Sequence, residues 1–176
     1  VNELTQKTYD ILPEASKQAF VREQKYNKNL KYQASLEIIN NYSIAAGAVA
    51  VTPIPFSDIA ILLPTQIAMI THVTCTYGFE INTESITKLA TSFAAVAAGG
   101  FAVRYVAGSL LKLIPVIGTI AGGTFNATVA ASTTKLMGNA YLAYLNDNFS
   151  LIYEGDFDLL KNLTDTVIKA YIEKVK

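Results

Sequence analysis

The chain has 176 residues, of which 51% are hydrophobic and 16% charged, and its 14 basic and 14 acidic side chains give a formal net charge of zero. An average soluble domain is about 25% charged, so this chain is apolar for its size. Nucleic-acid binding needs a basic surface, and the neutral composition predicts no nucleic-acid partner.

The length predicts a single helical domain over 1–176 with a sizeable core. Residues 1–37 and 135–176 hold 11 charged side chains each, whereas residues 38–134 hold six. We therefore expect an apolar body between two polar arms. Cys75 is the only cysteine, which rules out an intrachain disulfide and favours the cytoplasm. Because the chain begins with Val1, we interpret it as a piece of a longer protein.

Helical patterns follow one another along the chain, and no stretch alternates with the period of a strand. This predicts an all-α fold, a compact bundle of about five or six helices with an apolar central hairpin and polar terminal helices. A short helix over 4–12 should end before Pro13. Pro13 then opens a run without a breaker until Gly47. We expect one long helix here, polar over 13–42 and apolar from Ile44 to Val51.

The stretch from Thr52 to Asp58 is the sharpest signal in the sequence. Pro53 and Pro55 cannot both lie inside a helix, so the long helix must stop at this corner. Ser57 is a good N-cap for a second helix, which Asp58 would open with negative charge and Gly78 would end.

The remaining pattern predicts three more helical stretches. One runs from about residue 83 towards Leu113, and a turn follows over 114–118. A long helix then extends over about 121–145, which closes a core of 13–145. Asp158 should cap a C-terminal amphipathic helix within 156–176, with one apolar face: Leu159, Leu160, Leu163, Val167, Ile168, Tyr171, Ile172 and Val175.

Catalytic and cofactor signatures are weak. The glycine spacing over 118–123 is that of a phosphate-binding loop, but Thr124 and Phe125 stand where Lys and Ser or Thr are required. His72 and Cys75 form a poor metal or nucleophile set. We expect no enzyme, no cofactor and no bound metal, with His72 as a core or rim residue.

Two structural hypotheses concern the apolar body. Asp58 and Arg104 are each the lone charge in an apolar neighbourhood, and we expect them to pair. The alternatives are that Asp58 caps its own helix and that Arg104 reaches the rim. Small residues should mark close helix approaches, inside either a membrane or a soluble bundle: Gly99, Gly100, Gly118, Gly122 and Gly123.

Several segments together resemble a known family. They are Pro13 to Phe20 with Gln24 and Lys25, Thr52 to Asp58 with Gln66 and Met69, Leu110 to Gly118, and Ala130 to Tyr141 with Thr134 and Gly138. The chain is similar over roughly 12–145 to the YcjF-type bacterial domain of unknown function. The resemblance implies a GTPase-associated helical domain, placed after an Era-like, GTP-binding domain in one polypeptide and membrane-associated in some members. It brings no catalytic residues.

This resemblance predicts a non-catalytic domain that couples nucleotide state to a membrane surface or a protein partner, in the cytoplasm or at the inner face of the membrane. The alternative is a membrane-inserting channel-forming or pore-forming module. Lys25, Lys28 and Lys31 are candidate contacts of the polar helix with the GTPase or with anionic lipid, against the simpler interpretation of a solvated face. The sequence leaves the oligomeric state open.

Overall fold

The computed structural model describes residues 2–25, 27–50, 57–79, 83–94, 96, 117–154, 159–160 and 163–176. All regular structure within these ranges is helical, which confirms the all-α prediction. Pro53, Pro55, Arg104, Gly99 and Gly100 lie outside the described residues, so the expected Asp58–Arg104 pair stays a prediction.

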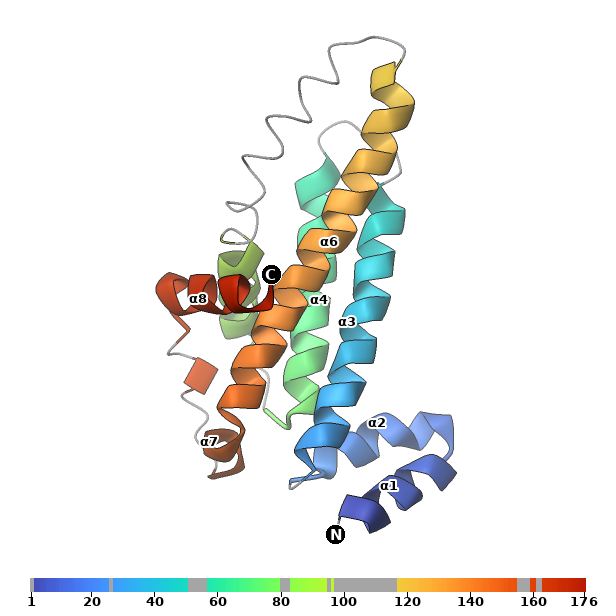
Figure 1. Ribbon diagram of the computed structural model, residues 1–176, viewed down its shortest axis with the longest axis vertical. Helices are drawn as coiled ribbons and strands as arrows, with labels where there is room; N and C mark the ends of the chain where they lie inside the picture. The colour runs from blue at the N-terminus through green and yellow to red at the C-terminus, as the bar shows by residue number, and fades with distance from the viewer. Residues whose placement is uncertain are drawn as a thin grey trace.

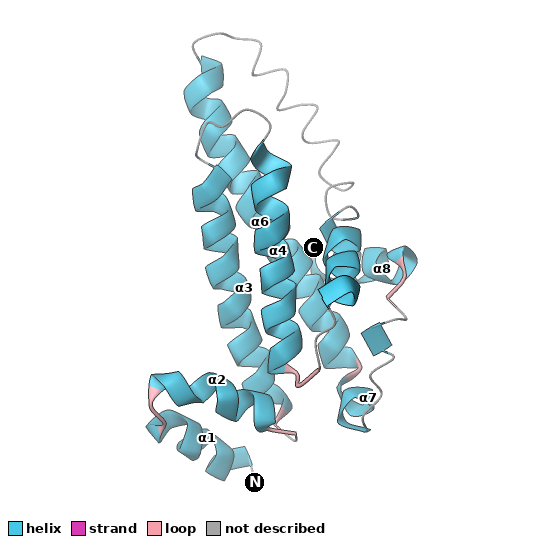
Figure 2. Cartoon of the chain, turned by 180° about the vertical axis from the view of Figure 1, so that it is seen from behind, coloured by secondary structure: helices cyan, strands magenta, loops and turns pink. Residues whose placement is uncertain are grey.

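Three long helices form the body: α3 (Lys28–Ala50), α4 (Ser57–Thr76) and α6 (Ile117–Asp147). They lie side by side, with α4 and α6 running in the same direction and α3 in the opposite one (Figures 1 and 2). The end of α3 and the starts of α4 and α6 therefore lie towards the same end of the molecule, at the top of Figure 1, where α6 reaches beyond the other two, and α1 and α2 lie at the opposite end.

The core lies where the three helices meet. Ile39 of α3, Met69 of α4 and Met137 of α6 are each 0% exposed. Two polar pairs cross it, with Gln66 Nε2 donating to Thr134 Oγ1 at 3.3 Å and the Thr74 and Tyr141 hydroxyls 2.8 Å apart. Because these buried groups are hydrogen-bonded, they fix the helix register at little cost in stability.

Glycine allows close helix crossings at two points that the sequence analysis did not single out. A Cβ on Gly138 of α6 would lie 2.7 Å from Ile39 Cγ2, and one on Gly47 of α3 would lie 3.2 Å from Ala131 Cβ. Gly118, Gly122 and Gly123 lie within α6, but the surroundings of these three glycines are outside what the structure describes. Their expected role in helix packing stays a prediction.

The N-terminal region corrects the expected single long helix over 13–51. Helix α1 (Asn2–Ile11) ends before Pro13 as expected, but α2 (Glu14–Glu23) stops at Gln24, whose backbone is extended. Helix α3 begins at Lys28, and the Asn27 side chain accepts a hydrogen bond from Leu30 N at 3.0 Å. Asparagine is a strong N-cap, so a local side-chain bond interrupts the helix without a proline or glycine.

The structure corrects the predicted first residues of two helices in the second half of the chain. Helix α6 begins at Ile117, so Ile117 and Gly118 belong to its first turn and not to the predicted turn over 114–118. The C-terminal helix α8 (Asp165–Val175) starts after Thr164, whose hydroxyl accepts from Val167 N at 3.4 Å, and not at Asp158. The predicted apolar face is confirmed for the five of its residues that lie on α8, Val167, Ile168, Tyr171, Ile172 and Val175, which belong to the core or pack against it. Leu159, Leu160 and Leu163 also do so, but they precede the helix.

The smaller elements complete the core beside α6. Helix α7 (Phe149–Glu154) follows α6 directly, and α8 packs against α6. Residues 83–94 are also helical, and Phe93 meets Tyr141 of α6 edge to face with ring centroids 5.6 Å apart. These contacts extend the three-helix body on the α6 side.

Candidate functional site

A buried lysine joins α2, α3 and α4 at the end of the body where α1 and α2 lie. Lys31 of α3 is only 2% exposed. Its ammonium donates to Val21 O at 3.0 Å, to Arg22 O at 2.9 Å and to Thr76 O at 2.7 Å. The sequence-based placement of Lys31 on an exposed cationic face is therefore wrong.

The three acceptors explain why a charge is stable at this position. They are carbonyls in the last turns of α2 and α4, at the negative ends of the two helix dipoles. Val21 O also accepts from Gln24 N at 3.2 Å, so the ammonium is its second donor. An ammonium has three donors, and each meets one carbonyl. Burial lowers the pKa of Lys31 to about 8, with the Glu23 carboxylate acting in the opposite direction. The group thus remains mainly charged at neutral pH.

The C-terminal cap of α4 leaves the carbonyl of Thr76 available to the ammonium of Lys31. Gly78 has a φ of +88°, Gly78 N donates to Cys75 O at 2.9 Å, and Phe79 N donates to Thr74 O at 3.4 Å. This pair of bonds is the Schellman motif, and it uses the carbonyls of Thr74 and Cys75 while Thr76 O turns to Lys31. The predicted stop at Gly78 is confirmed.

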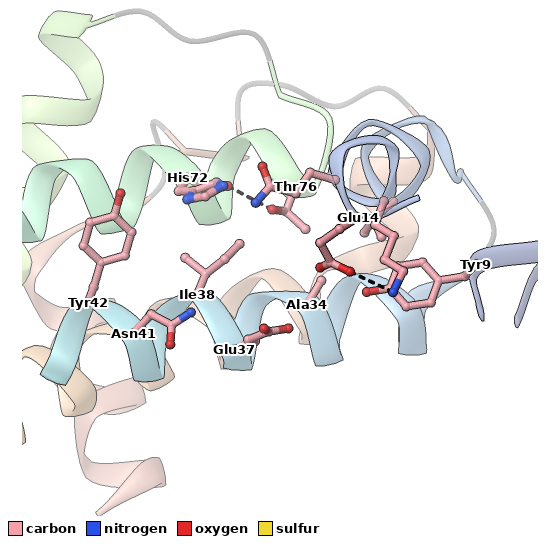
Figure 3. Close-up of a pocket in the computed structure, with 12 residues that line it drawn as sticks. Tyr9, Glu14, Ala34, Glu37, Ile38, Asn41, Tyr42, His72 and Thr76 are labelled. Atoms are coloured by element: carbon pink, nitrogen blue, oxygen red, sulfur yellow. Dashed lines mark hydrogen bonds and ion pairs between the residues drawn. The ribbon is translucent and has the colours of Figure 1, made fainter. Parts of the chain in front are cut away.

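A groove of about 220 Å³ lies next to Lys31, between α2 and the pair α3–α4. Figure 3 shows His72 of α4 facing Ile38 and Tyr42 of α3, with Glu14 of α2 towards one end. The His72 and Tyr42 rings meet edge to face with centroids 6.2 Å apart. Partial burial lowers the pKa of His72, so the imidazole is neutral at pH 7. This agrees with the expected rim position.

The described helix residues at the opposite end of the body are almost free of charge. We define the uncharged end as residues 44–50 of α3, 59–65 of α4 and 117–133 of α6, none of which is Asp, Glu, Lys, Arg or His. Asp58, in the first turn of α4, directly precedes this set. Ile44 is 71% exposed, and Ala45, Ala48 and Pro64 are also exposed. A water-facing surface without charges over three helices is unusual for a soluble domain and is typical of an interaction site.

The other two candidate lysines differ from Lys31. Lys25 is exposed, and Lys28 is half-buried with its ammonium 6.0 Å from the centre of the Phe149 ring. Sequence could have placed Lys31 differently, because it shares the helical spacing of Ser35, Ile38 and Ile39, all of which are buried. A lysine in register with an apolar stripe is the signal that the sequence analysis missed.

Two kinds of site are absent from the described ranges. No group of three or more His, Cys, Asp and Glu side chains lies close enough together there to hold a metal ion. Nor does any helix in the described part of the chain combine the length and hydropathy needed to cross a bilayer.

The fold and these sites define a helical domain with one uncharged end and one polar end. The chain belongs to the family described as a domain of unknown function, DUF697, whose pattern it matches over residues 16–170. It is also 28% identical over 137 residues to magnetosome membrane protein 22 of Magnetospirillum gryphiswaldense. That alignment covers 78% of this chain and 66% of the relative, just under two thirds of its length. No solved structure matches the chain.

Proposed function

We propose that this is a non-catalytic domain that binds a membrane surface through its uncharged end and couples that contact to a GTPase domain in the same polypeptide. The observation that carries the proposal is the uncharged end itself, three helix segments without a charged residue and with Ile44 71% exposed. The hydrocarbon region of a bilayer accepts apolar side chains but strongly disfavours charged ones.

The similarity to a protein named as a magnetosome membrane protein supports a membrane over a protein partner. The position of the uncharged end adds to this support, because it lies away from the polar helices α1 and α2 (Figure 1). A domain of this shape can rest its uncharged end on lipid and present its polar end to a neighbouring domain.

The GTPase side of the proposal rests on the resemblance to the YcjF-type family and on the polar end. Exposed Lys25 and half-buried Lys28 lie there, close to the junction of α2 with α3. Lys31 is not part of this surface, because its ammonium donates hydrogen bonds to three backbone carbonyls.

Liposome flotation tests the membrane contact. We expect the domain to float with neutral phosphatidylcholine vesicles and Ile44→Glu to abolish flotation, because a carboxylate at this surface must be dehydrated on binding. Gln33→Glu is the matched control, an exposed site on α3 three helical turns away that should float normally. Equal flotation of both variants would contradict the lipid contact. Absence of flotation for the unmodified domain would point to a protein partner instead.

Two further measurements separate the alternatives. Release of a trapped dye from the same vesicles would favour the pore-forming alternative, whereas we expect intact vesicles. For coupling, the full-length gene product should hydrolyse GTP at a rate that vesicles change, and Lys25→Glu should reduce that change. Lys135→Glu, an exposed site on α6, is the control. A full-length product without a nucleotide-binding loop would refute coupling and leave the lipid contact standing.

A further inference from the structure

Helix α2 is only lightly attached to the body. Val21 is the one buried residue among the ten of α2, all of which the structure describes. The ion pairs of α2 stay within it, Lys17 with Glu14 at 2.9 Å and Arg22 with Glu23 at 3.1 Å. Glu14, Lys17 and Gln18 of α2 line the groove.

The attachment is concentrated at the end of α2. Val21 and Arg22 give their carbonyls to Lys31, which also holds Thr76 O of α4. The next residue after the helix, Gln24, has an extended backbone that can act as a hinge. One ammonium thus fastens α2 to both α3 and α4 beside a break in the helix.

We propose that α1 and α2 form a strap that docks and undocks as a unit, with Lys31 as the latch and Gln24 at the hinge. Undocking uncovers the groove side of α3 and α4, where Ile38, Tyr42 and His72 lie. The device rests on geometry alone and stands whether or not the membrane contact or the GTPase coupling is correct.

Loss of the ammonium would undock α2 because the backbone carbonyls would then need water as a hydrogen-bond donor. Without the ammonium, the buried Thr76 O and the partly buried Arg22 O lose a hydrogen-bond donor, and a buried acceptor without a partner is unfavourable. Water can replace the donor only if α2 moves off the body. The core of α3, α4 and α6 does not depend on this contact, because its largest buried side chains lie elsewhere on those helices.

Amide hydrogen exchange on Lys31→Met tests the latch, since methionine keeps the apolar stem and removes the charge. We expect exchange in α2 to accelerate at least tenfold while exchange in the middle of α6 is unchanged. Lys135→Met removes an exposed lysine and should alter neither region. Unchanged exchange in α2 of Lys31→Met would overturn the proposal.

Two readouts on other features guard against a variant that merely misfolds. His72 is the only histidine, so its acylation by diethyl pyrocarbonate reports how open the groove is, and we expect it to be several-fold faster in Lys31→Met. In the unmodified domain at low denaturant, α2 amides should exchange through a local unfolding reaction that α6 amides do not share. A single global opening for both helices would refute the strap.

Discussion

Replacing Gly138 by alanine tests how tightly α6 packs against α3 and α4. The added Cβ would lie 2.7 Å from Ile39 Cγ2, 2.8 Å from Ile39 Cγ1 and 3.1 Å from Met69 Sδ. Carbon atoms prefer separations of about 3.5–4.0 Å, so the two carbon contacts are severe overlaps. Met69 can rotate away, but Ile39 is 0% exposed and β-branched, with its Cγ atoms held close to the helix backbone.

The magnitude follows from two opposing effects. Overpacking a well-packed core costs about 1–3 kcal/mol. Alanine is favoured over glycine inside a helix by about 1 kcal/mol, which offsets part of that cost. Because both carbon contacts are shorter than 3.0 Å, we take the upper end of the overpacking range and expect Gly138→Ala to lower the free energy of unfolding by about 2 kcal/mol, measured by urea denaturation followed by circular dichroism.

Two comparisons sharpen this test. Gly47→Ala is the matched control, because its Cβ would meet Ala131 Cβ at 3.2 Å and Ala127 O at 3.3 Å, and a smaller change is expected. In an Ile39→Leu background the cost of Gly138→Ala should fall, since leucine moves the branch away from the backbone. Gly138→Ala as stable as the unmodified protein would refute the reasoning.

Three further predictions concern individual helix ends and the buried ammonium. Between pH 8 and 10.5 the free energy of unfolding should rise with pH. Burial lowers the pKa of Lys31 to about 8 in the folded protein, so over this range the unfolded chain keeps a proton that the folded protein releases. The same pH profile in Lys31→Met would contradict this. Thr164→Ala should remove the α8 cap and cost about 0.5–2 kcal/mol, with faster amide exchange in the first turn of α8 and Thr166→Ala, an exposed neighbour, as the control. Gly78→Ala should cost about 1–2 kcal/mol because of its φ of +88°, whereas Gly78→Asn, which tolerates that backbone better, should cost less; equal losses in thermal denaturation would rule out backbone strain.

Local signals in the sequence account for much of the secondary structure. The stop at Gly78 and the apolar face of α8 were predictable because a positive φ and a helical stripe depend on neighbouring residues. The break at Gln24 was missed because it depends on Asn27 acting as a cap inside a run of good helix formers, and cap strength competes with propensity over only a few residues.

Of the two candidate sites, the uncharged end was partly predictable from the sequence and the Lys31 site was not. Composition alone determined that residues 38–134 are nearly free of charge, and hence that an uncharged surface would exist if their helix ends met. Only the tertiary structure decided that α3 ends where α4 and α6 begin, which places that surface at one end of the molecule. Lys31 shows the limit of sequence most clearly. Its three partners come from two other helices, one of them 45 positions along the chain, and no pattern of neighbours specifies which distant carbonyls a side chain will reach.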